Sequence, residues 1–464
     1  MGMTPGSRSF WMSVAIVGAF VGAFLALPTC ATAQSEGQNS VYYYVSSSNP
    51  GQCCDGSAAF IDATPFGGST KNFCGVLNGI LSSTGFASGG VIDARGLPGA
   101  TGTSMTCSIS PWNGISSPPP AIILLPATGG TSPNPIVIDS AWILPSNTHL
   151  IGEGDNPASG TTVQGSTNYV TSTGAMIQFG NSTFCPSGCT GISIESLTLD
   201  GQGQSLNAIS NQYAGESSFV DHVSLYRFIG TGLSVSNAGS STYANNSGPY
   251  SNITFDTGSS SGTSSTVCAQ ILSLNGTRGI HGLRCNAGSR DATVAVLLDS
   301  SNNSIEDVTI ASFYNGILIG SQANAHSNVL LNIVGDTNQG TVESPINVIQ
   351  ISSNHTVTDL SIMGVVNQGT GGGEYTIVDD ETSTTLSDAS VGVYALGEQR
   401  NGVYSRFTTS PSVVTWAVGS NYPRGTCAQG SIYSCTGSSS NCTKSLTPYA
   451  LWACKSSGGW TGVE

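Results

Sequence analysis

Charged residues are scarce in this sequence, and their scarcity narrows both the fold and the partners. Only 8% of the 464 residues are charged, whereas soluble domains carry roughly 25%. Helices with a solvated face depend on Lys, Glu and Arg, so the composition argues against a mostly helical protein. The 12 basic and 26 acidic residues give a net charge of −14. This balance argues against nucleic acid and anionic membrane surfaces as partners, because both are bound through clustered cations.

Motifs for phosphate and metal chemistry are also missing. The chain contains no GxxxxGK phosphate-binding loop and no HExxH metal site. No two of its five histidines lie at the sequence spacing of metal ligands. They are His149, His222, His281, His326 and His355. We therefore predict neither a metal nor a cofactor.

Long apolar runs are absent except at the N-terminus. Arg8 precedes the apolar run from Trp11 to Leu27, and the small residues of 31–33 fit a cleavage site. We predict a signal peptide over residues 1–33, an exported mature protein that begins at Gln34, and no membrane contact after cleavage. An uncleaved anchor is the alternative, since the run nearly reaches spanning length.

Cysteine is well represented, and its number favours disulfides. Cleavage of the signal peptide would remove Cys30 and leave 12 of the 13 cysteines. An even number in an exported chain indicates disulfide bonds. Cys185 and Cys189 would close a short local loop. Four more cysteines cluster near the C-terminus and should pair among themselves: Cys427, Cys435, Cys442 and Cys454. Zinc is the alternative for these four, but the spacing lacks paired CxxC knuckles.

A short pattern recurs through the middle of the chain: an apolar residue, two turn-like residues, an apolar residue, any residue, and an apolar residue. Its copies are Ile194–Leu199, Val220–Leu225, Tyr250–Phe255, Ile280–Cys285, Ile305–Ile310, His326–Leu331 and Val357–Ile362. Each copy alternates like a strand with one buried face, and such units bury that face only by stacking. The predicted interior column is Leu197, Val223, Ile253, Leu283, Val308, Val329 and Leu360.

Two further segments complete a resemblance. Residues 71–85 carry apolar side chains at helical spacing, with Ser69 or Thr70 as a cap and Gly85 as a terminator, and 89–94 form an entry strand. With 144–154 as an early coil, the chain resembles the secreted right-handed parallel β-helix proteins of the pectate lyase and polygalacturonase-like superfamily. The resemblance covers roughly residues 60–390 of the sequence.

The resemblance implies an all-β solenoid with an N-terminal capping helix. The expected divisions are a signal peptide (1–33), an N-terminal arm with the helix (34–119), the parallel β-helix (120–390) and a small disulfide-stapled β appendage (391–464). The appendage would cap the open end of the coil, whose sheet edge is otherwise exposed, or bind a partner.

The catalytic motifs of the polygalacturonase-like enzymes are not reproduced. Ile280–Gly282 is only superficially similar to the family's Gly-His-Gly, and Asp379–Asp380 to its Asp-Asp motif. A lyase acting on a polyanion is disfavoured, because this chain is itself polyanionic. The resemblance therefore implies a carbohydrate polymer as partner without implying a reaction.

The repeat still suggests a site. The position after each third apolar residue should point outward, which gives one column of Asp200, Tyr226, Asp256, Asn286, Ala311, Asn332 and Met363. Coils rise about 4.8 Å, so the two aspartates would lie roughly 10 Å apart, near the upper end for an inverting carboxylate pair. We predict Asp200 and Asp256 as catalytic residues outside the core. The predicted substrate-binding residues are Tyr226, Tyr243, Tyr250, Arg284 and Asn286.

Other interpretations stay open. Asp and Asn are common at strand ends simply because their side chains bond the local backbone. The first hypothesis is an exported β-helix protein that binds or hydrolyses a neutral polysaccharide, with paired carboxylates if it is catalytic. The alternative is a non-catalytic adhesin or structural β-helix protein at a surface.

Overall fold

A computed structural model describes most of the chain between residues 59 and 367, together with shorter C-terminal pieces. The described ranges are 32–33, 42–45, 59–99, 103–128, 135–169, 174–237, 246–258, 260, 262–272, 276–289, 291–335, 347–352, 354–367, 375–379, 386–387, 390–393, 405–406, 414–419, 421–423, 429–444, 447–456 and 459–463. The expected signal segment lies outside them, except for β1 (Thr32–Ala33). No helix within these ranges is long and apolar enough to cross a membrane.

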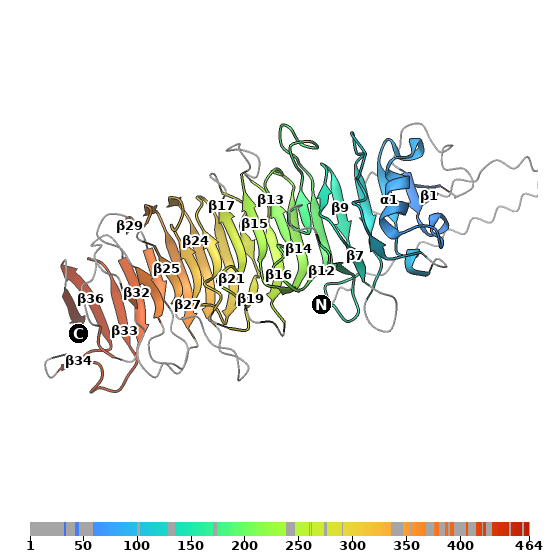
Figure 1. Ribbon diagram of the computed structural model, residues 1–464. Coiled ribbons are helices and arrows are strands. Elements are labelled where there is room, and N and C mark those ends of the chain that lie inside the picture. Colours follow the sequence, from blue (N-terminus) through green and yellow to red (C-terminus); the bar gives the residue numbers. More distant parts are fainter. Residues whose placement is uncertain are drawn as a thin grey trace, which may run out of the picture.

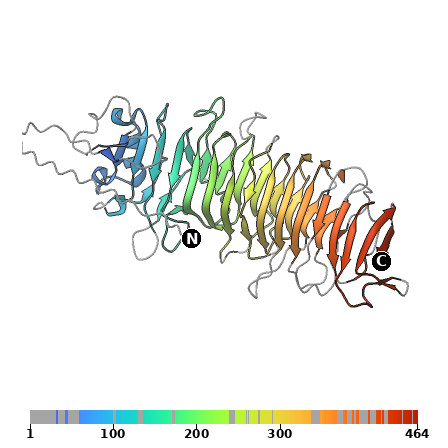
Figure 2. The same cartoon turned by 180° about the vertical axis from the view of Figure 1, so that it is seen from behind.

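Strands from successive turns of the chain pair in parallel, so the protein is a right-handed parallel β-helix (Figure 1, Figure 2). One stack of parallel strands begins near the N-terminus and continues to the C-terminal end. In order it comprises β2 (Tyr42–Val45), β3 (Ala59–Asp62), β4 (Gly90–Asp93), β6 (Ala121–Leu124), β9 (Thr148–Ile151), β12 (Ser193–Gln204), β14 (Phe219–Phe228), β16 (Tyr250–Asp256), β18 (Ile280–His281) with β19 (Arg284–Asn286), β21 (Ser304–Ala311), β24 (Val329–Gly335), β27 (Ser361–Asn367), β30 (Ser390–Val393), β32 (Val414–Gly419) and β33 (Ile432–Cys435).

A second stack forms another wall of the coil. It comprises β8 (Trp142–Leu144), β11 (Ile177–Phe179), β13 (Ile209–Asn211), β15 (Thr231–Ser236), β17 (Val267–Leu272), β20 (Val294–Leu298), β22 (Asn315–Ile319), β25 (Asn347–Ile351), β28 (Tyr375–Asp379) and β31 (Ser405–Arg406). Short strands complete the early and late coils: β5 (Thr106–Cys107), β7 (Ile136–Ile138), β10 (Thr162–Gly165), β23 (Ala325–His326), β26 (Val357–Thr358) and β29 (Leu386–Ser387). Interior side chains from these walls form one continuous core.

One residue per coil bends the first stack into two faces. These corner residues all have positive φ, between 51° and 69°: Ser196, His222, Asn252, Gly282, Asp307, Asn332 and Gly364. Gly reaches this left-handed region without steric cost, and Asn and Asp reach it more readily than other residues with a Cβ. The corner coincides with the second turn-like position of the repeat in Ile194–Leu199, Val220–Leu225, Tyr250–Phe255, Ile280–Cys285 and Ile305–Ile310. We call the part of the strand stack before the corner the first face, and the part after the corner the second face.

The predicted interior column is correct for five coils and wrong for two. Val329 is 37% exposed, and the register aligns Val308 with Ile333 and then with Val365. Leu360 is buried but precedes the strand that carries Val365. The column is therefore Leu197, Val223, Ile253, Leu283, Val308, Ile333 and Val365, each at most 1% exposed.

The two misplaced copies have a physical explanation. Ser327 and Asp359, within them, also have positive φ, but they belong to the preceding corner of the coil. Val329, Leu330 and Leu331 are all apolar, so alternation alone does not identify the buried residue.

The N-terminal end is covered by a helix, as predicted, but its cap differs. Helix α1 (Phe73–Leu81) begins after Asn72, whose side-chain oxygen accepts a hydrogen bond from the Gly75 N–H at 2.7 Å. It ends at Ser82 rather than at Gly85. Three short 3-10 helices flank it: η1 (Thr64–Phe66), η2 (Thr84–Phe86) and η3 (Leu97–Gly99).

Parallel stacking extends past both expected boundaries of the coil. Strands β3 and β4, before residue 120, pair in register with one another and with β6. After residue 390, β30, β32 and β33 continue the same stack. The stack then ends in the antiparallel strands β36 (Leu451–Ser456) and β37 (Gly459–Val463). A hairpin of β34 (Thr443–Lys444) and β35 (Thr447–Pro448) lies beside them in sequence.

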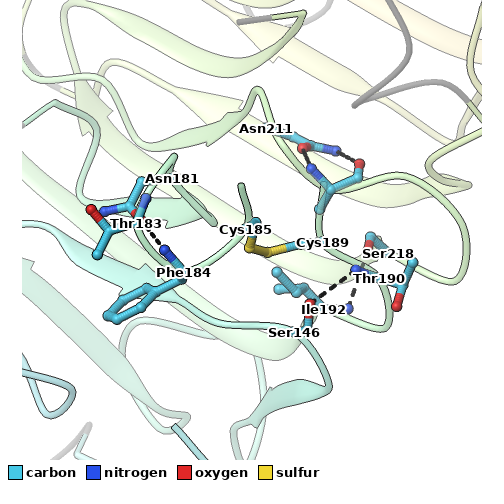
Figure 3. The surroundings of a disulfide bond; sticks show 11 residues. Ser146, Asn181, Thr183, Phe184, Cys185, Cys189, Thr190, Ile192, Asn211 and Ser218 are labelled. Carbon is cyan, nitrogen blue, oxygen red and sulfur yellow. Dashed lines mark hydrogen bonds between the residues drawn. A yellow bond between two sulfur atoms is a disulfide. The ribbon is translucent and has the colours of Figure 1, made fainter. Parts of the chain in front are cut away.

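Disulfides connect separate walls as well as local loops. The predicted Cys185–Cys189 bridge is present beside the Asn181 turn (Figure 3). In the appendage Cys435 bonds Cys442, and Cys454 is also disulfide-bonded. Cys427 lies outside the described residues. Two further bridges were not predicted: Cys74–Cys107 joins α1 to β5, and Cys268–Cys285 joins the two stacks across the core.

The corrected register can be tested with a pair of substitutions on one strand. Ile333→Asp would bury an unpaired charge and should lower the free energy of unfolding by roughly 3–5 kcal/mol. Val329→Asp would place the carboxylate on the outer surface of the chain and should change the free energy of unfolding of the monomer by less than about 1 kcal/mol. Denaturant unfolding of both variants measures the difference. The reverse order of stability would mean that Val329, not Ile333, faces the core.

Candidate functional site

The predicted outward column exists on the second face. Strand register places Asp200 beside Tyr226, Tyr226 beside Asp256, and Asp256 beside Asn286. The column continues to Ala311 and does not include Asn332, which is a corner residue, or Met363, which is on the first face. Four consecutive coils therefore present Asp, Tyr, Asp and Asn side by side.

Asp200 is an anchor for Arg227 rather than an open carboxylate. The Arg227 Nε donates to Asp200 Oδ1 at 2.9 Å, and its Nη2 donates to Oδ2. The backbone N–H and side-chain amide of Gln202 donate to the same two oxygens at 3.0 and 2.8 Å. Asp200 is only 4% exposed, so the expectation that it lies outside the core is wrong. The bidentate pairing of the carboxylate with Arg227 fixes both side chains.

Arg227 in turn supports the aromatic ring of the column. Its guanidinium carbon lies 5.3 Å from the centre of the Tyr226 ring, within cation–π range. The hydrogen bond to Asp200 raises the pKa of Arg227 further above its usual value. A Cβ on Gly258 would lie 2.9 Å from the Arg227 Cγ and 3.5 Å from the Tyr226 ring. Asp200, Arg227 and Gly258 together hold Tyr226 in a defined place.

Asp256 and Asn286 each bond their own turn. The Asp256 Oδ1 accepts from the Gly258 N–H at 2.6 Å, and the Asn286 Oδ1 accepts from the Gly288 N–H at 3.1 Å. These are the local backbone bonds that favour Asp and Asn at strand ends. Both residues remain partly exposed. No hydrogen bond to Asp256 Oδ2 or Asn286 Nδ2 occurs within the described part of the chain, so these atoms can meet a ligand.

The remaining predicted binding residues are placed differently. Arg284 is exposed on the outward row beside the column, between Thr254 and Thr309 in the register. Tyr243 lies outside the described residues. Tyr250 is fully buried, so the expectation that it stacks on a sugar ring is wrong.

Tyr250 serves the core instead. Its hydroxyl donates to Ser247 Oγ at 2.8 Å and accepts from Asn211 Nδ2 at 2.9 Å. Burial raises the pKa of this hydroxyl to about 12. The repeat itself indicates that Tyr250 is buried, because Tyr250 occupies the first apolar position of its copy, as Val220 and Ile280 do in theirs.

Two other ionisable groups were not singled out from the sequence, and both lie away from the column. On the first face, His149 Nδ1 lies 2.7 Å from Ser193 Oγ, which donates to Glu195 at 2.5 Å. Burial lowers the pKa of His149, and Glu195 opposes that shift. After β20, Asp299 accepts from the Ser321 N–H at 2.6 Å, and burial raises its pKa. No cluster of three metal-ligating side chains occurs among the described residues.

Comparison with known proteins finds only distant structural likenesses. No family model matches the chain. No curated protein matches it either. Among solved structures, ORF18 of Geobacillus virus E2 is similar, with 12% identity and a TM-score of 0.38 over 73% of this chain. The chain spans 58% of the length of that viral protein.

Two carbohydrate enzymes are also similar in structure. The A-module of mannuronan C-5 epimerase AlgE4 from Azotobacter vinelandii has 11% identity and a TM-score of 0.30, covering 64% of this chain and 90% of that module. DFA-IIIase from Arthrobacter chlorophenolicus A6, without its lid, has 12% identity and a TM-score of 0.32, covering 77% and 91%. Likeness at this level assigns no activity to this chain.

The distinct roles of the two aspartates can be measured. Asp200→Asn removes the charge that pairs with Arg227 and should lower the free energy of unfolding by about 1–3 kcal/mol. Asp256→Asn keeps an oxygen for the Gly258 N–H and should change stability by less than about 0.5 kcal/mol. Denaturant unfolding gives both values. Equal stability of the two variants would contradict the anchoring role of Asp200.

Proposed function

We propose that the protein is an exported β-helix protein that binds a neutral carbohydrate polymer along the second face. Tyr226, Asp256 and Asn286 would make the central contacts, with Arg284 beside them. The observation that carries the proposal is their alignment on β14, β16 and β19 around a tyrosine ring held by Arg227 and the buried carboxylate of Asp200. Disulfides are consistent with an oxidising, extracytoplasmic location.

The geometry suits a polymer that runs along the coil axis. Coils rise about 4.8 Å, which is close to the length of one sugar residue in an extended chain. A tyrosine ring offers an apolar face to a sugar ring, and its hydroxyl can reach the rim. The Asn286 amide and the Asp256 carboxylate could then bond the hydroxyls of neighbouring sugar residues. A polyanionic polymer would be repelled by a chain with net charge −14.

Binding without turnover is favoured over hydrolysis. A glycosidase needs one carboxyl group that can protonate the leaving oxygen and a second that acts as base or nucleophile. Both oxygens of Asp200 already accept hydrogen bonds from Arg227 and Gln202. Asp200 is therefore proposed as the residue that positions Arg227 and Tyr226, and Asp256 as the carboxylate that faces the glycan.

A glycan array followed by calorimetry on its hits tests the proposal. The wild type should bind a neutral polysaccharide, and Tyr226→Ala should weaken binding about tenfold, or roughly 1.4 kcal/mol. Tyr314→Ala is the matched control, because Tyr314 is 45% exposed and lies outside the column. Reducing ends released during incubation would show hydrolysis.

The outcomes separate the hypotheses. Binding without released reducing ends supports the binding protein, and Asp256→Asn should then weaken affinity only. Turnover that Asp256→Asn abolishes would return the protein to the hydrolases. The proposal is wrong if no neutral glycan binds, or if Tyr226→Ala binds as tightly as the wild type.

A further inference from the structure

Exposed aliphatic side chains gather at one place on the coil. Eight large apolar residues among the described ones are substantially exposed, and six of them belong to the C-terminal part of the first stack. We call these six the apolar strip: Val329, Leu331, Met363, Ile432, Leu451 and Val463. The other two, Ile109 and Tyr314, lie elsewhere in the fold. Contiguous exposed apolar surface marks interaction sites in soluble proteins.

Strand register connects the exposed residues of β24 and β27 with Ile432 of β33. Leu331 on β24 aligns with Met363 on β27, and the same column passes through Gly392 and Trp416 to Ile432 on β33. The strands follow one another along the coil axis to the C-terminal end (Figure 1). The exposed side chains of Leu331 and Met363 therefore share one strand register with the exposed Ile432.

The appendage extends the strip on its outer surface. Register places Leu451 of β36 beside Val463 of β37, and both are more than a third exposed. Trp452 and Cys454, which alternate with them, are buried in the small core of the appendage. Lys455 is exposed on the same outer side of β36, two residues after Ala453, which aligns with Ile432.

Charge differs sharply between the last 66 residues and the rest of the chain. Residues 1–398 hold 7 basic and 25 acidic residues, a net of −18, whereas residues 399–464 hold 5 basic residues and 1 acidic residue, a net of +4. On the N-terminal side, Glu306 of β21 occupies the same column, one strand before Leu331. Beyond the C-terminal side stands Lys455. The strip is thus flanked by an acidic end and a basic end.

We propose that the apolar strip is the contact surface of a dimer in which a second copy of this chain lies antiparallel to the first. A twofold axis near β30 would place β27 opposite the partner's β32, and β24 opposite the partner's β33. Leu331 would then face Ile432 of the partner subunit. The strand that carries Glu306 would face the strand that carries Lys455 of the partner subunit, so opposite charges meet at both ends.

The dimensions agree with a stable interface. The row from β21 to β36 spans six inter-strand steps, or about 29 Å at 4.8 Å each. A standard interface buries about 800 Å² on each partner, a patch roughly 30 Å across. Apolar side chains bordered by polar ones are also the usual composition of such a patch. An anionic membrane is disfavoured as the occupant, because the neighbouring coil has a net charge of −18.

Sedimentation equilibrium of the full-length mature protein tests the proposal without any glycan. The wild type should be a dimer, and Met363→Asp should make it monomeric. Ile109→Asp is the matched control, because Ile109 is 42% exposed and lies outside the strip. Ile432→Asp, on a different coil, is a second disrupting variant in case Met363→Asp misfolds. Circular dichroism should show an unchanged strand signal in every variant.

Charge exchange tests the antiparallel arrangement. Glu306→Lys and Lys455→Glu should each weaken the dimer, and the two together should restore most of the lost affinity. A monomeric wild type, or a dimer that survives both Met363→Asp and Ile432→Asp, would overturn the proposal. Failure of the double exchange to restore the dimer would overturn the antiparallel orientation.

Discussion

A left-handed backbone conformation at one residue per coil is the constraint on which the rest of this structure depends. Each corner residue turns the chain between two faces, and the parallel pairing resumes directly after it. Because the corners stack, the apolar residues that follow them also stack, and Leu197, Val223 and Ile253 share one interior column. The same alignment gives each coil an equivalent outward position. Core, candidate site and apolar strip are therefore consequences of one repeated bend.

The sequence predicted the coil well because its signals were redundant. Five copies of the repeat combine period-two alternation with a turn-like corner residue, which is Asn, Gly or Asp in three of them, and all five are placed correctly. The helix over 73–81 and the Cys185–Cys189 loop were equally local signals. Errors arose where one signal acted alone. At Val329 three successive apolar residues removed the alternation, and the turn residue Ser327 belonged to another corner.

The candidate site was predictable in position but not in chemistry. Alternation correctly aligned Asp200, Tyr226, Asp256 and Asn286 across four coils. It could not show that Arg227, adjacent to Tyr226 in sequence, occupies both oxygens of Asp200. Arg227 has positive φ, so its side-chain direction does not follow from strand alternation. Tyr250 was misjudged by residue type, since its place in the repeat already indicated the core.

The account rests most directly on the left-handed corner, and Asn252 (φ 53°, on β16) allows a clean measurement. Asn252→Gly and Asn252→Val both lose the hydrogen bond to Asp221, so the difference in their free energies of unfolding isolates the backbone. The account predicts that the Val variant is less stable than the Gly variant by about 1–2 kcal/mol. At Thr254, an ordinary strand position, the order should reverse, with Val more stable than Gly. A Val variant at 252 as stable as the Gly variant would contradict the account.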